Sequence, residues 1–183
     1  MLLHVPNVLT KAQVQSIREA INQDDQWVSG KKTAGGQASQ IKNNLQINTE
    51  SALYQQLSQF VMQNIKNNLL IQSFALPNEV LLPMFNCYQD TGHYGNHVDS
   101  AIHYLNEKNK NVRTDVSLTV FLSESDEYEG GELIIEDTYG THEVKLDAGD
   151  AILYPSTSLH RVEPVTTGSR IAAFTWIQSM VKD

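Results

Sequence analysis

Two histidines and one aspartate stand at positions that can together bind a metal ion. His97 and Asp99 are two residues apart, and on an extended backbone residues i and i+2 point to the same face. His160 lies much further along the chain, shortly after a segment with strand character. Two histidines and one carboxylate on one face form the facial triad that non-haem Fe(II) proteins use, with coordination positions left open.

One arginine extends this set. Arg170 lies in the last strand-like segment, and a hairpin through residues 164–168 would bring it back beside the strand near His160. A guanidinium group offers a planar fork of donors that matches a carboxylate. The sequence therefore predicts a metal site with a carboxylate-bearing cosubstrate bound beside it.

The elements that position these residues begin with helices, whose signals are confined to the first third of the chain. Thr10 and Gln13 have the spacing of a capping box, and apolar residues follow at helical spacing. A second helix is predicted over residues 51–70. Its apolar stripe consists of Leu53, Leu57, Phe60, Val61, Ile65 and Leu69.

From Val80 onward the pattern changes to short alternating segments separated by turn residues. The predicted strands are residues 81–88, 115–122, 131–136, 141–146, 151–154 and 170–177. Many short strands at this spacing favour a β-sandwich, a jelly roll or a small barrel. We therefore expect a single domain over 1–183, mostly β, with a helical N-terminal part to about residue 79 and a β core over about 80–178.

Composition narrows the class of protein. The 183 residues include 13 Lys and Arg against 21 Asp and Glu, a formal net charge of −8. This balance argues against a nucleic-acid partner, because proteins that bind the phosphate backbone need clustered basic residues. No apolar run approaches the length of a membrane span. The first residues lack the pattern of a signal peptide, and the single Cys87 allows no internal disulfide. We expect a soluble, cytoplasmic protein.

With His97, Asp99, His160 and Arg170 in this order, the sequence resembles the Fe(II)/2-oxoglutarate dioxygenases of the prolyl-4-hydroxylase-like class. The closer resemblance is to the bacterial PKHD-type hydroxylases, which are often associated with iron uptake. It covers nearly the whole chain. The matching segments are QIKNN (40–44), FNCY (85–88), YGNHVD (94–99), RTD (113–115), GGEL (130–133), LYPSTSLH (153–160) and WIQSM (176–180).

The resemblance implies a fold, cofactors and roles for individual residues. The family fold is a double-stranded β-helix, or jelly roll, with N-terminal helices. His97, Asp99 and His160 would hold Fe(II), and Arg170 would bind the distal carboxylate of 2-oxoglutarate. Tyr88 matches a position that reaches the cosubstrate in related hydroxylases, although a core tyrosine is an equally good interpretation. Ascorbate would return oxidised iron to the ferrous state.

The sequence also departs from the family. Cys87 and His103 stand where arginine is usual, and either can line the substrate pocket, although Cys87 also fits the role of a small core residue. Trp176 shares strand parity with Arg170 and so is a further pocket candidate. The helical tail that follows the Met180 region in the family is absent here, and a homo-oligomer remains compatible with the sequence.

These observations predict an Fe(II)- and 2-oxoglutarate-dependent dioxygenase that hydroxylates a small molecule or peptide. One alternative is a jelly roll that senses iron or 2-oxoglutarate without turnover. Another is a zinc or manganese enzyme of the cupin type, against which Arg170 argues, because a hydrolase needs no carboxylate fork. The substrate itself is not readable from the sequence.

Overall fold

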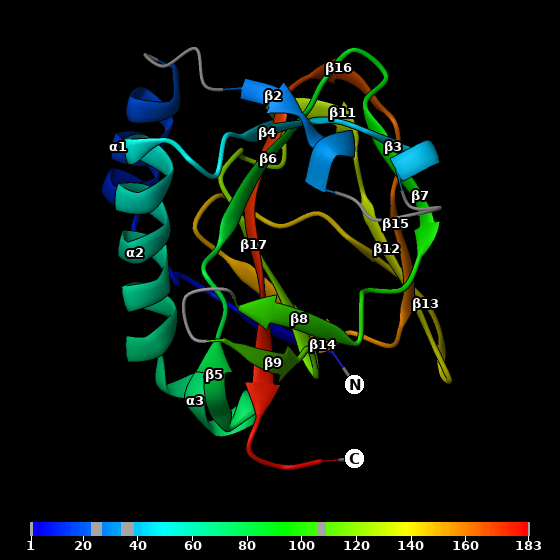
Figure 1. The fold of residues 1–183 in the computed structure, drawn as a ribbon. Helices are drawn as coiled ribbons and strands as arrows, with labels where there is room; N and C mark the ends of the chain where they lie inside the picture. Colours follow the sequence, from blue (N-terminus) through cyan, green and yellow to red (C-terminus); the bar gives the residue numbers. More distant parts are fainter. Residues whose placement is uncertain (1, 23–26, 34–38, 106–108, 183) are drawn as a thin grey trace.

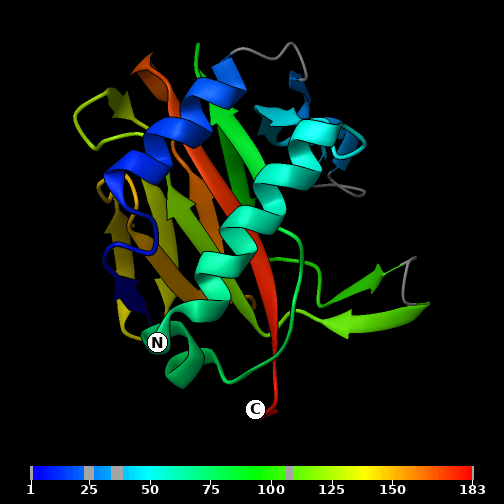
Figure 2. The same cartoon turned by 90° about the vertical axis from the view of Figure 1, so that its left-hand side faces the viewer.

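Helices lie on one side of the molecule and β-sheets on the other, as Figures 1 and 2 show. The computed structural model describes residues 2–22, 27–33, 39–105 and 109–182. Its helices are α1 (Lys11–Asn22), α2 (Ala52–Asn67) and α3 (Leu69–Ala75), with a short 3-10 helix at Gly30–Thr33. None of the helices in these ranges is long and apolar enough to cross a lipid bilayer.

Helix α1 begins where the sequence predicts it. The Thr10 N–H donates to Gln13 Oε1 at 2.8 Å, and the Gln13 N–H donates to Thr10 Oγ1 at 3.2 Å. These two bonds form a reciprocal capping box, which satisfies two backbone donors that the helix itself leaves unpaired. Val14, Ile17 and Ile21 are buried, so the predicted apolar face of this helix is confirmed.

The second helix was predicted over residues 51–70, but the structure has two helices here, α2 and α3, which meet at Asn68. The Asn68 side chain accepts hydrogen bonds from the N–H groups of Leu70 and Ile71, and thereby caps a separate helix, α3. Because the chain turns at Asn68, Leu69 leaves the stripe and is 82% exposed. Phe60 lies to one side of the buried stripe and is 40% exposed. The stripe that does pack consists of Tyr54, Leu57, Ser58, Val61 and Ile65.

The larger sheet packs against the helices. In the described ranges it has eight strands in the order β1-β14-β10-β17-β6-β4-β2, with β5 pairing to β17. Its strands are β1 (Leu3–Val5), β2 (Trp27–Ser29), β4 (Leu45–Ile47), β5 (Pro77–Val80), β6 (Met84–Tyr88), β10 (Val116–Phe121), β14 (Ala151–Pro155) and β17 (Arg170–Ser179). The N-terminal part is therefore not purely helical, because it also adds strands to this sheet.

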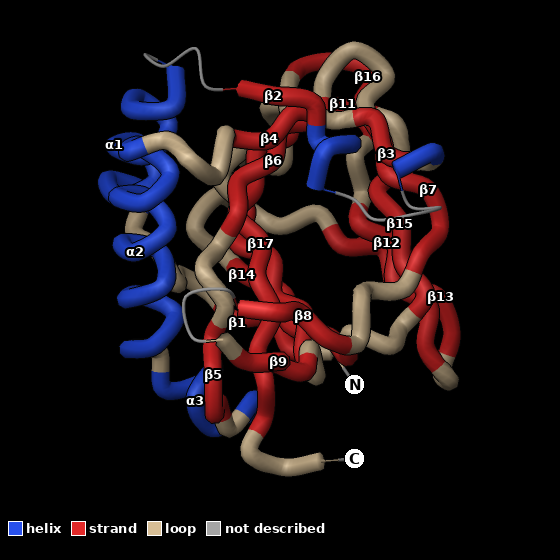
Figure 3. The backbone as a smooth tube through the Cα atoms, in the orientation of Figure 1, coloured by secondary structure: helices blue, strands red, loops and turns tan. Residues whose placement is uncertain are grey.

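A second, smaller sheet faces the larger sheet. It lies on the side of the larger sheet opposite to the helices, and Figure 3 shows the helices as a separate layer. Its order is β13-β12-β15-β7-β3. The strands are β3 (Lys42–Asn43), β7 (His93–His97), β12 (Leu133–Asp137), β13 (Gly140–Val144) and β15 (Leu159–Val162). Two further pairs complete the described β structure: β11 (Tyr128–Gly130) with β16 (Val165–Gly168), and β8 (Ile102–Leu105) with β9 (Lys110–Arg113).

Two apolar cores result from this layering. One lies between the helices and the larger sheet and includes Ile17, Val61, Phe85 and Ile171. The other lies on the opposite side of that sheet and includes Phe121, Leu133, Ile135 and Val162. Residues of the larger sheet alternate between the two sides, as the period of a β-strand requires.

The predicted class, mostly β with helices in the N-terminal part, agrees with this architecture. All six predicted strands are present, with ends shifted by a few residues. The strands β7 and β15, which carry His97 and His160, lay outside the prediction. β7 (HYGNH) is polar apart from Tyr94, and β15 (LHRV) is only four residues long, so neither is long and apolar enough to show the alternating pattern from which a strand is predicted.

Candidate metal and cosubstrate site

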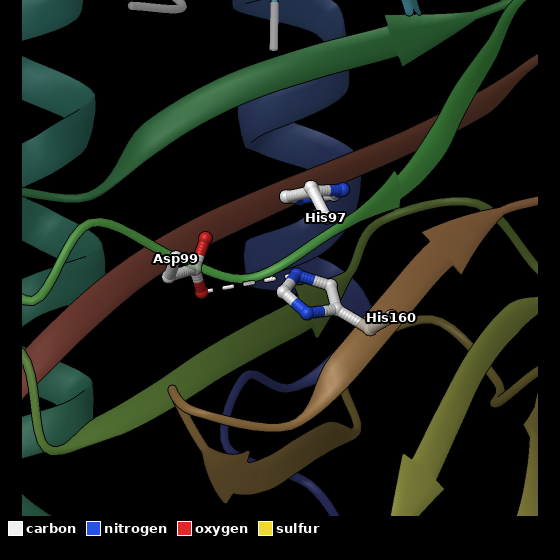
Figure 4. Close-up of side chains that lie close together, drawn as sticks. All are labelled: His97, Asp99 and His160. Carbon is white, nitrogen blue, oxygen red and sulfur yellow. Dashed lines mark ion pairs between the residues drawn. The ribbon is translucent and has the colours of Figure 1, made fainter. Parts of the chain in front are cut away.

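His97 and His160 lie directly opposite each other on neighbouring antiparallel strands. Their Cα atoms are register partners in the β7–β15 pair, and their ring centroids are 4.1 Å apart. The register shifts between His160 and Val162, next to this pair. Such an irregularity alters the direction of nearby side chains and is common beside functional sites. Figure 4 shows both imidazoles and Asp99 gathered at one place.

Backbone carbonyls hold both imidazoles in one tautomer. His97 Nδ1 lies 2.7 Å from the carbonyl oxygen of Gly95, and His160 Nδ1 lies 3.0 Å from that of Ser158. A carbonyl oxygen can only accept, so each Nδ1 carries the proton and donates. The lone pair of each ring is therefore on Nε2, the arrangement that orients a histidine for metal binding.

Asp99 is the third member of the cluster and is held by two serines. Its backbone N–H donates to the carbonyl of Ser156 at 3.2 Å, and its Oδ2 accepts from Ser117 Oγ at 2.5 Å. The Oγ atoms of Ser117 and Ser156 are 2.8 Å apart, which links the two supports. Asp99 Oδ2 lies 3.8 Å from His160 Nε2 (Figure 4).

The donor atoms of His97, Asp99 and His160 all lie within 4.8 Å of one another. Burial, followed by the nearby His160, lowers the pKa of His97 to about 4, so its imidazole is neutral at pH 7. Two imidazoles, each with its Nδ1 directed at a backbone carbonyl, and one carboxylate, together on one side, fit Fe(II). The types of these donor atoms and their spacing are therefore compatible with an Fe(II) site.

Arg170 approaches the same pocket from the larger sheet and is only 1% exposed. Its guanidinium carbon lies 5.0 Å from the ring centroid of Phe121 and 5.4 Å from that of Tyr88. Among the described residues no carboxylate pairs with it, and its Nε has no hydrogen-bond partner. A buried cation without a counter-ion is costly, so this position suits a ligand that brings a carboxylate.

Gly131 gives Arg170 the room it occupies. The φ of Gly131 is +70°, and a Cβ atom built there would come within 2.7 Å of Val165 Cγ2 and 3.2 Å of Arg170 Cδ. A side chain at this position would meet both backbone strain and a steric clash with the segment that supports the arginine. The close approach explains a glycine in this part of the GGEL segment.

Tyr88 is the register partner of Arg170 on β6 and lines the same pocket. Burial raises the pKa of its phenol to about 12, although the nearby Arg170 acts in the opposite direction. The phenol therefore keeps its proton at neutral pH and can donate a hydrogen bond. Its place beside the guanidinium agrees with a position at the cosubstrate.

The predicted hairpin between His160 and Arg170 is wrong. Residues 164–168 do not turn the chain back along β15, because β16 pairs instead with β11. His160 and Arg170 consequently belong to different sheets, and they line the pocket from its two sides rather than from neighbouring strands.

Of the three further pocket candidates, Trp176 and His103 line the pocket and Cys87 does not. The rings of His103 and Trp176 stack with centroids 4.4 Å apart, which joins β8 to β17. Cys87 is on the opposite face of β6 from Tyr88 and packs in the helix-side core. Successive strand residues point to opposite faces, so Cys87 takes the second of the two roles that the sequence leaves open, that of a small core residue.

Several pocket residues were not predicted. Lys42 lies within the QIKNN segment, is 5% exposed and lines the pocket from β3. Tyr94, the first residue of the YGNHVD segment, stacks on His97 with a centroid distance of 3.6 Å. Tyr154 makes an edge contact with the His160 ring at 5.1 Å, and Asn86 lies on the pocket face of β6. The alternation of β6 and β14 is the signal that would have revealed the last two.

Comparisons with known proteins agree with this geometry. A model of the 2OG-Fe(II) oxygenase superfamily matches residues 83–178. A PKHD-type hydroxylase of Hyphomonas neptunium is 54% identical over 183 residues, which is 100% of this chain and 80% of the relative. The chain belongs to this family. It is a 2-oxoglutarate-dependent hydroxylase of the PKHD type.

Solved structures of lower identity share its fold. A prolyl-4-hydroxylase from Pseudomonas putida superposes with a TM-score of 0.69 at 19% identity, covering 97% of this chain and 92% of its own. HygX from Streptomyces hygroscopicus, solved with nickel and 2-oxoglutarate bound, has a TM-score of 0.64 at 14% identity, covering 98% and 83%. Membership of this family implies that the protein depends on iron and 2-oxoglutarate. The residues that line the pocket are the candidates for binding them.

Proposed function

We propose that the chain binds Fe(II) through His97, Asp99 and His160, binds 2-oxoglutarate through Arg170 and Tyr88, and hydroxylates a C–H bond of a small molecule or peptide. The observation that carries the proposal is the arrangement of the pocket. A cluster of two histidines and a carboxylate lines one side, and a buried guanidinium that pairs with no carboxylate among the described residues lines the other.

Each of these residues has a defined task in the proposal. His97 and His160 present Nε2 lone pairs because their Nδ1 atoms are committed to backbone carbonyls. Ser117 holds Asp99 in one orientation. Arg170 would hold the distal carboxylate of the cosubstrate, and Tyr88, its register partner, would donate a hydrogen bond beside it. With Fe(II) and 2-oxoglutarate bound, the site would supply the oxidative chemistry of this family, in which 2-oxoglutarate and O₂ are consumed, succinate and CO₂ are released, and a C–H bond is hydroxylated.

The finer features of the fold and the cofactor set are proposed on the same basis. The two facing antiparallel sheets support a double-stranded β-helix, or jelly roll, within a single domain over 1–183. Residues 83–178, which match the superfamily, fall within the proposed core of 80–178. The resemblance to PKHD-type hydroxylases further supports ascorbate as the reductant of oxidised iron and a role linked to iron uptake.

The test is succinate formation by the Fe(II)-loaded protein in air, with iron content measured alongside. We expect the wild type to release succinate, and His97→Ala, Asp99→Ala and His160→Ala each to lose iron severely, because three ligands leave no redundancy. Iron content near that of the wild type in all three variants would remove these residues as ligands. A wild type that binds iron and 2-oxoglutarate without forming succinate would favour the sensor alternative.

A further inference from the structure

The three proposed metal ligands differ in what fixes their positions. His97 and His160 are register partners on β7 and β15, and a backbone carbonyl holds the Nδ1 atom of each ring. Asp99 lies two residues beyond the end of β7, in a segment without regular secondary structure. Sheet register therefore fixes the two histidines but not the aspartate, whose position depends on contacts with other segments.

Those contacts come from the larger sheet. Ser117 is on β10, and Ser156 follows β14 directly. The Ser156 carbonyl accepts from the Asp99 N–H at 3.2 Å, and Ser117 Oγ lies 2.5 Å from Asp99 Oδ2. The two hydroxyl oxygens are 2.8 Å apart and close a ring of contacts around Asp99. The third ligand is thus held from the sheet opposite the one that carries both histidines.

The chemistry of the groups gives these hydrogen bonds a direction. A carboxylate can only accept, so the single proton of the Ser117 hydroxyl points to Asp99. Ser117 Oγ must then accept from Ser156, whose own proton points to Ser117. The result is a relay from Ser156 through Ser117 to Asp99. Its last bond ends on a charged group, and a hydroxyl that donates to the first one polarises and strengthens that bond.

The two hydroxyls are buried, at 3% exposure for Ser117 and 1% for Ser156. A buried hydroxyl has a cost of desolvation that an alanine in the same place does not have. The hydroxyl of Ser156 is also not needed to hold its own segment, because its backbone N–H donates to the Asp115 carbonyl at 3.1 Å. Packing therefore does not account for this pair of serines, whereas support of Asp99 does.

We propose that Ser117 and Ser156 are positioning residues for the metal. Ser156 orients the Ser117 hydroxyl, and Ser117 holds the Asp99 carboxylate in the orientation that metal binding needs. The affinity for the metal then depends on two hydroxyls that are not among the proposed ligands. This inference rests on the proposed function, because it takes Asp99 as a ligand.

The experiment titrates the metal-free protein with Mn(II) and measures the free ion by its electron paramagnetic resonance signal. Mn(II) accepts nitrogen and oxygen ligands, and the measurement needs no turnover. Partners that hold a metal ligand in place contribute roughly 10- to 100-fold to metal affinity. We expect a loss of that size in Ser117→Ala, whereas Ser117→Thr, which keeps the hydroxyl, should retain most of the affinity.

A double-mutant cycle tests the relay itself, which a merely structural role of the two serines would not reproduce. Ser156→Ala keeps the backbone bond to Asp99 and removes only the hydroxyl, so it should weaken Mn(II) binding by roughly two- to fourfold. In the Ser117→Ala background the same change should have no effect, because no hydroxyl remains for Ser156 to orient. Equal losses from Ser156→Ala in both backgrounds would overturn the relay.

Ser123→Ala is the matched control for the loss of a buried hydroxyl. Ser123 is 1% exposed and lies outside the pocket lining. Its Oγ donates to the Ser169 carbonyl at 2.8 Å and accepts from the Ile171 N–H at 2.9 Å. This variant loses two hydrogen bonds of the fold, yet it should bind Mn(II) as the wild type does. A loss equal to that of Ser117→Ala would assign the effect to general destabilisation and overturn the proposal.

Asp99→Ala separates this inference from the proposed function. Unchanged or tighter Mn(II) binding in Ser117→Ala, or a loss in Ser117→Thr as large as in Ser117→Ala, would overturn the positioning role. If Asp99→Ala still loses Mn(II), the metal site stands without that role. A wild type that binds no Mn(II), or an Asp99→Ala variant that binds it as the wild type does, would instead contradict the proposed metal site.

Discussion

The two faces of strands β6 and β17 differ in chemistry although their residues alternate along the same backbone. On the helix side lie Phe85, Cys87 and Ile171, all in the apolar core. On the pocket side lie Tyr88 and Arg170, next to them in sequence. One face packs in the apolar core and the other lines the proposed binding pocket, so residues of the two faces alternate along each strand. Substitutions on the two faces should therefore separate stability from ligand binding.

The largest effect on stability is expected on the helix side. Phe85 is fully buried, so Phe85→Ala removes an aromatic ring from the core and should lower the free energy of unfolding by about 3–5 kcal/mol. Urea unfolding of the metal-free protein measures this change. At a temperature where the variant remains folded, its affinity for 2-oxoglutarate should match that of the wild type. A variant that keeps its stability but loses 2-oxoglutarate binding would contradict the division between the faces.

The matching change on the pocket side is Arg170→Ala. It removes the proposed partner of the distal carboxylate and should weaken 2-oxoglutarate binding by about 2–5 kcal/mol, or roughly 30-fold to several thousand-fold. Arg170→Lys should recover only part of the affinity, because an ammonium group lacks the planar fork. Anaerobic titration of the Fe(II) protein measures the affinity.

Iron content is the control for this pair of variants. Arg170 is not among the proposed metal ligands, so Arg170→Ala should bind iron as the wild type does. If that variant also binds 2-oxoglutarate as tightly as the wild type, the role of the arginine is wrong. If it loses iron as well, the change has damaged the site as a whole and the two sides of the pocket are not independent.

The difference between the faces also explains what could be predicted from the sequence. The helix-side residues of α1 and the four long strands of the larger sheet, β6, β10, β14 and β17, follow apolar periodicities, so their positions were predictable. The shorter strands β1, β2, β4 and β5 were not predicted. His97, Asp99, His160 and Arg170 were found by residue type and spacing and by resemblance to a family. Which sheet each belongs to was not predictable, because strand pairing between distant segments leaves no local pattern in the sequence.

The residues whose positions depend on contacts with distant segments, or on the register of a strand, were the hardest to predict. Lys42 stands in a polar segment, and only the pairing of β3 with β7 brings it above Tyr94. Asn68 ends one helix and caps the next through its side chain, which the continuous apolar pattern conceals. For Cys87 the sequence leaves a pocket position and a core position open, and the alternation of residues along β6 decides for the core. In each case the decisive information is a contact or a register rather than a residue type.

The smallest effect is expected at Cys87, where the division between faces is tested by a single residue. Cys87 lies in the helix-side core, so Cys87→Ser places a hydroxyl among apolar groups and should cost about 1–2 kcal/mol of stability. The affinity for 2-oxoglutarate should not change, because the neighbouring Tyr88 keeps its place on the other face. Urea unfolding and anaerobic titration measure the two quantities.

Thiol alkylation gives an independent measure of the same position. Burial raises the pKa of the Cys87 thiol to about 11. Only the thiolate reacts, so at pH 8 roughly one thiol in a thousand is reactive, and the rate should rise about tenfold per pH unit until the pKa is reached. Native protein should therefore react slowly with iodoacetamide at pH 8, and 2-oxoglutarate should not alter the rate, because the thiol is not in its pocket. Rapid alkylation that 2-oxoglutarate prevents would place Cys87 on the binding face, and β6 would no longer separate stability from binding.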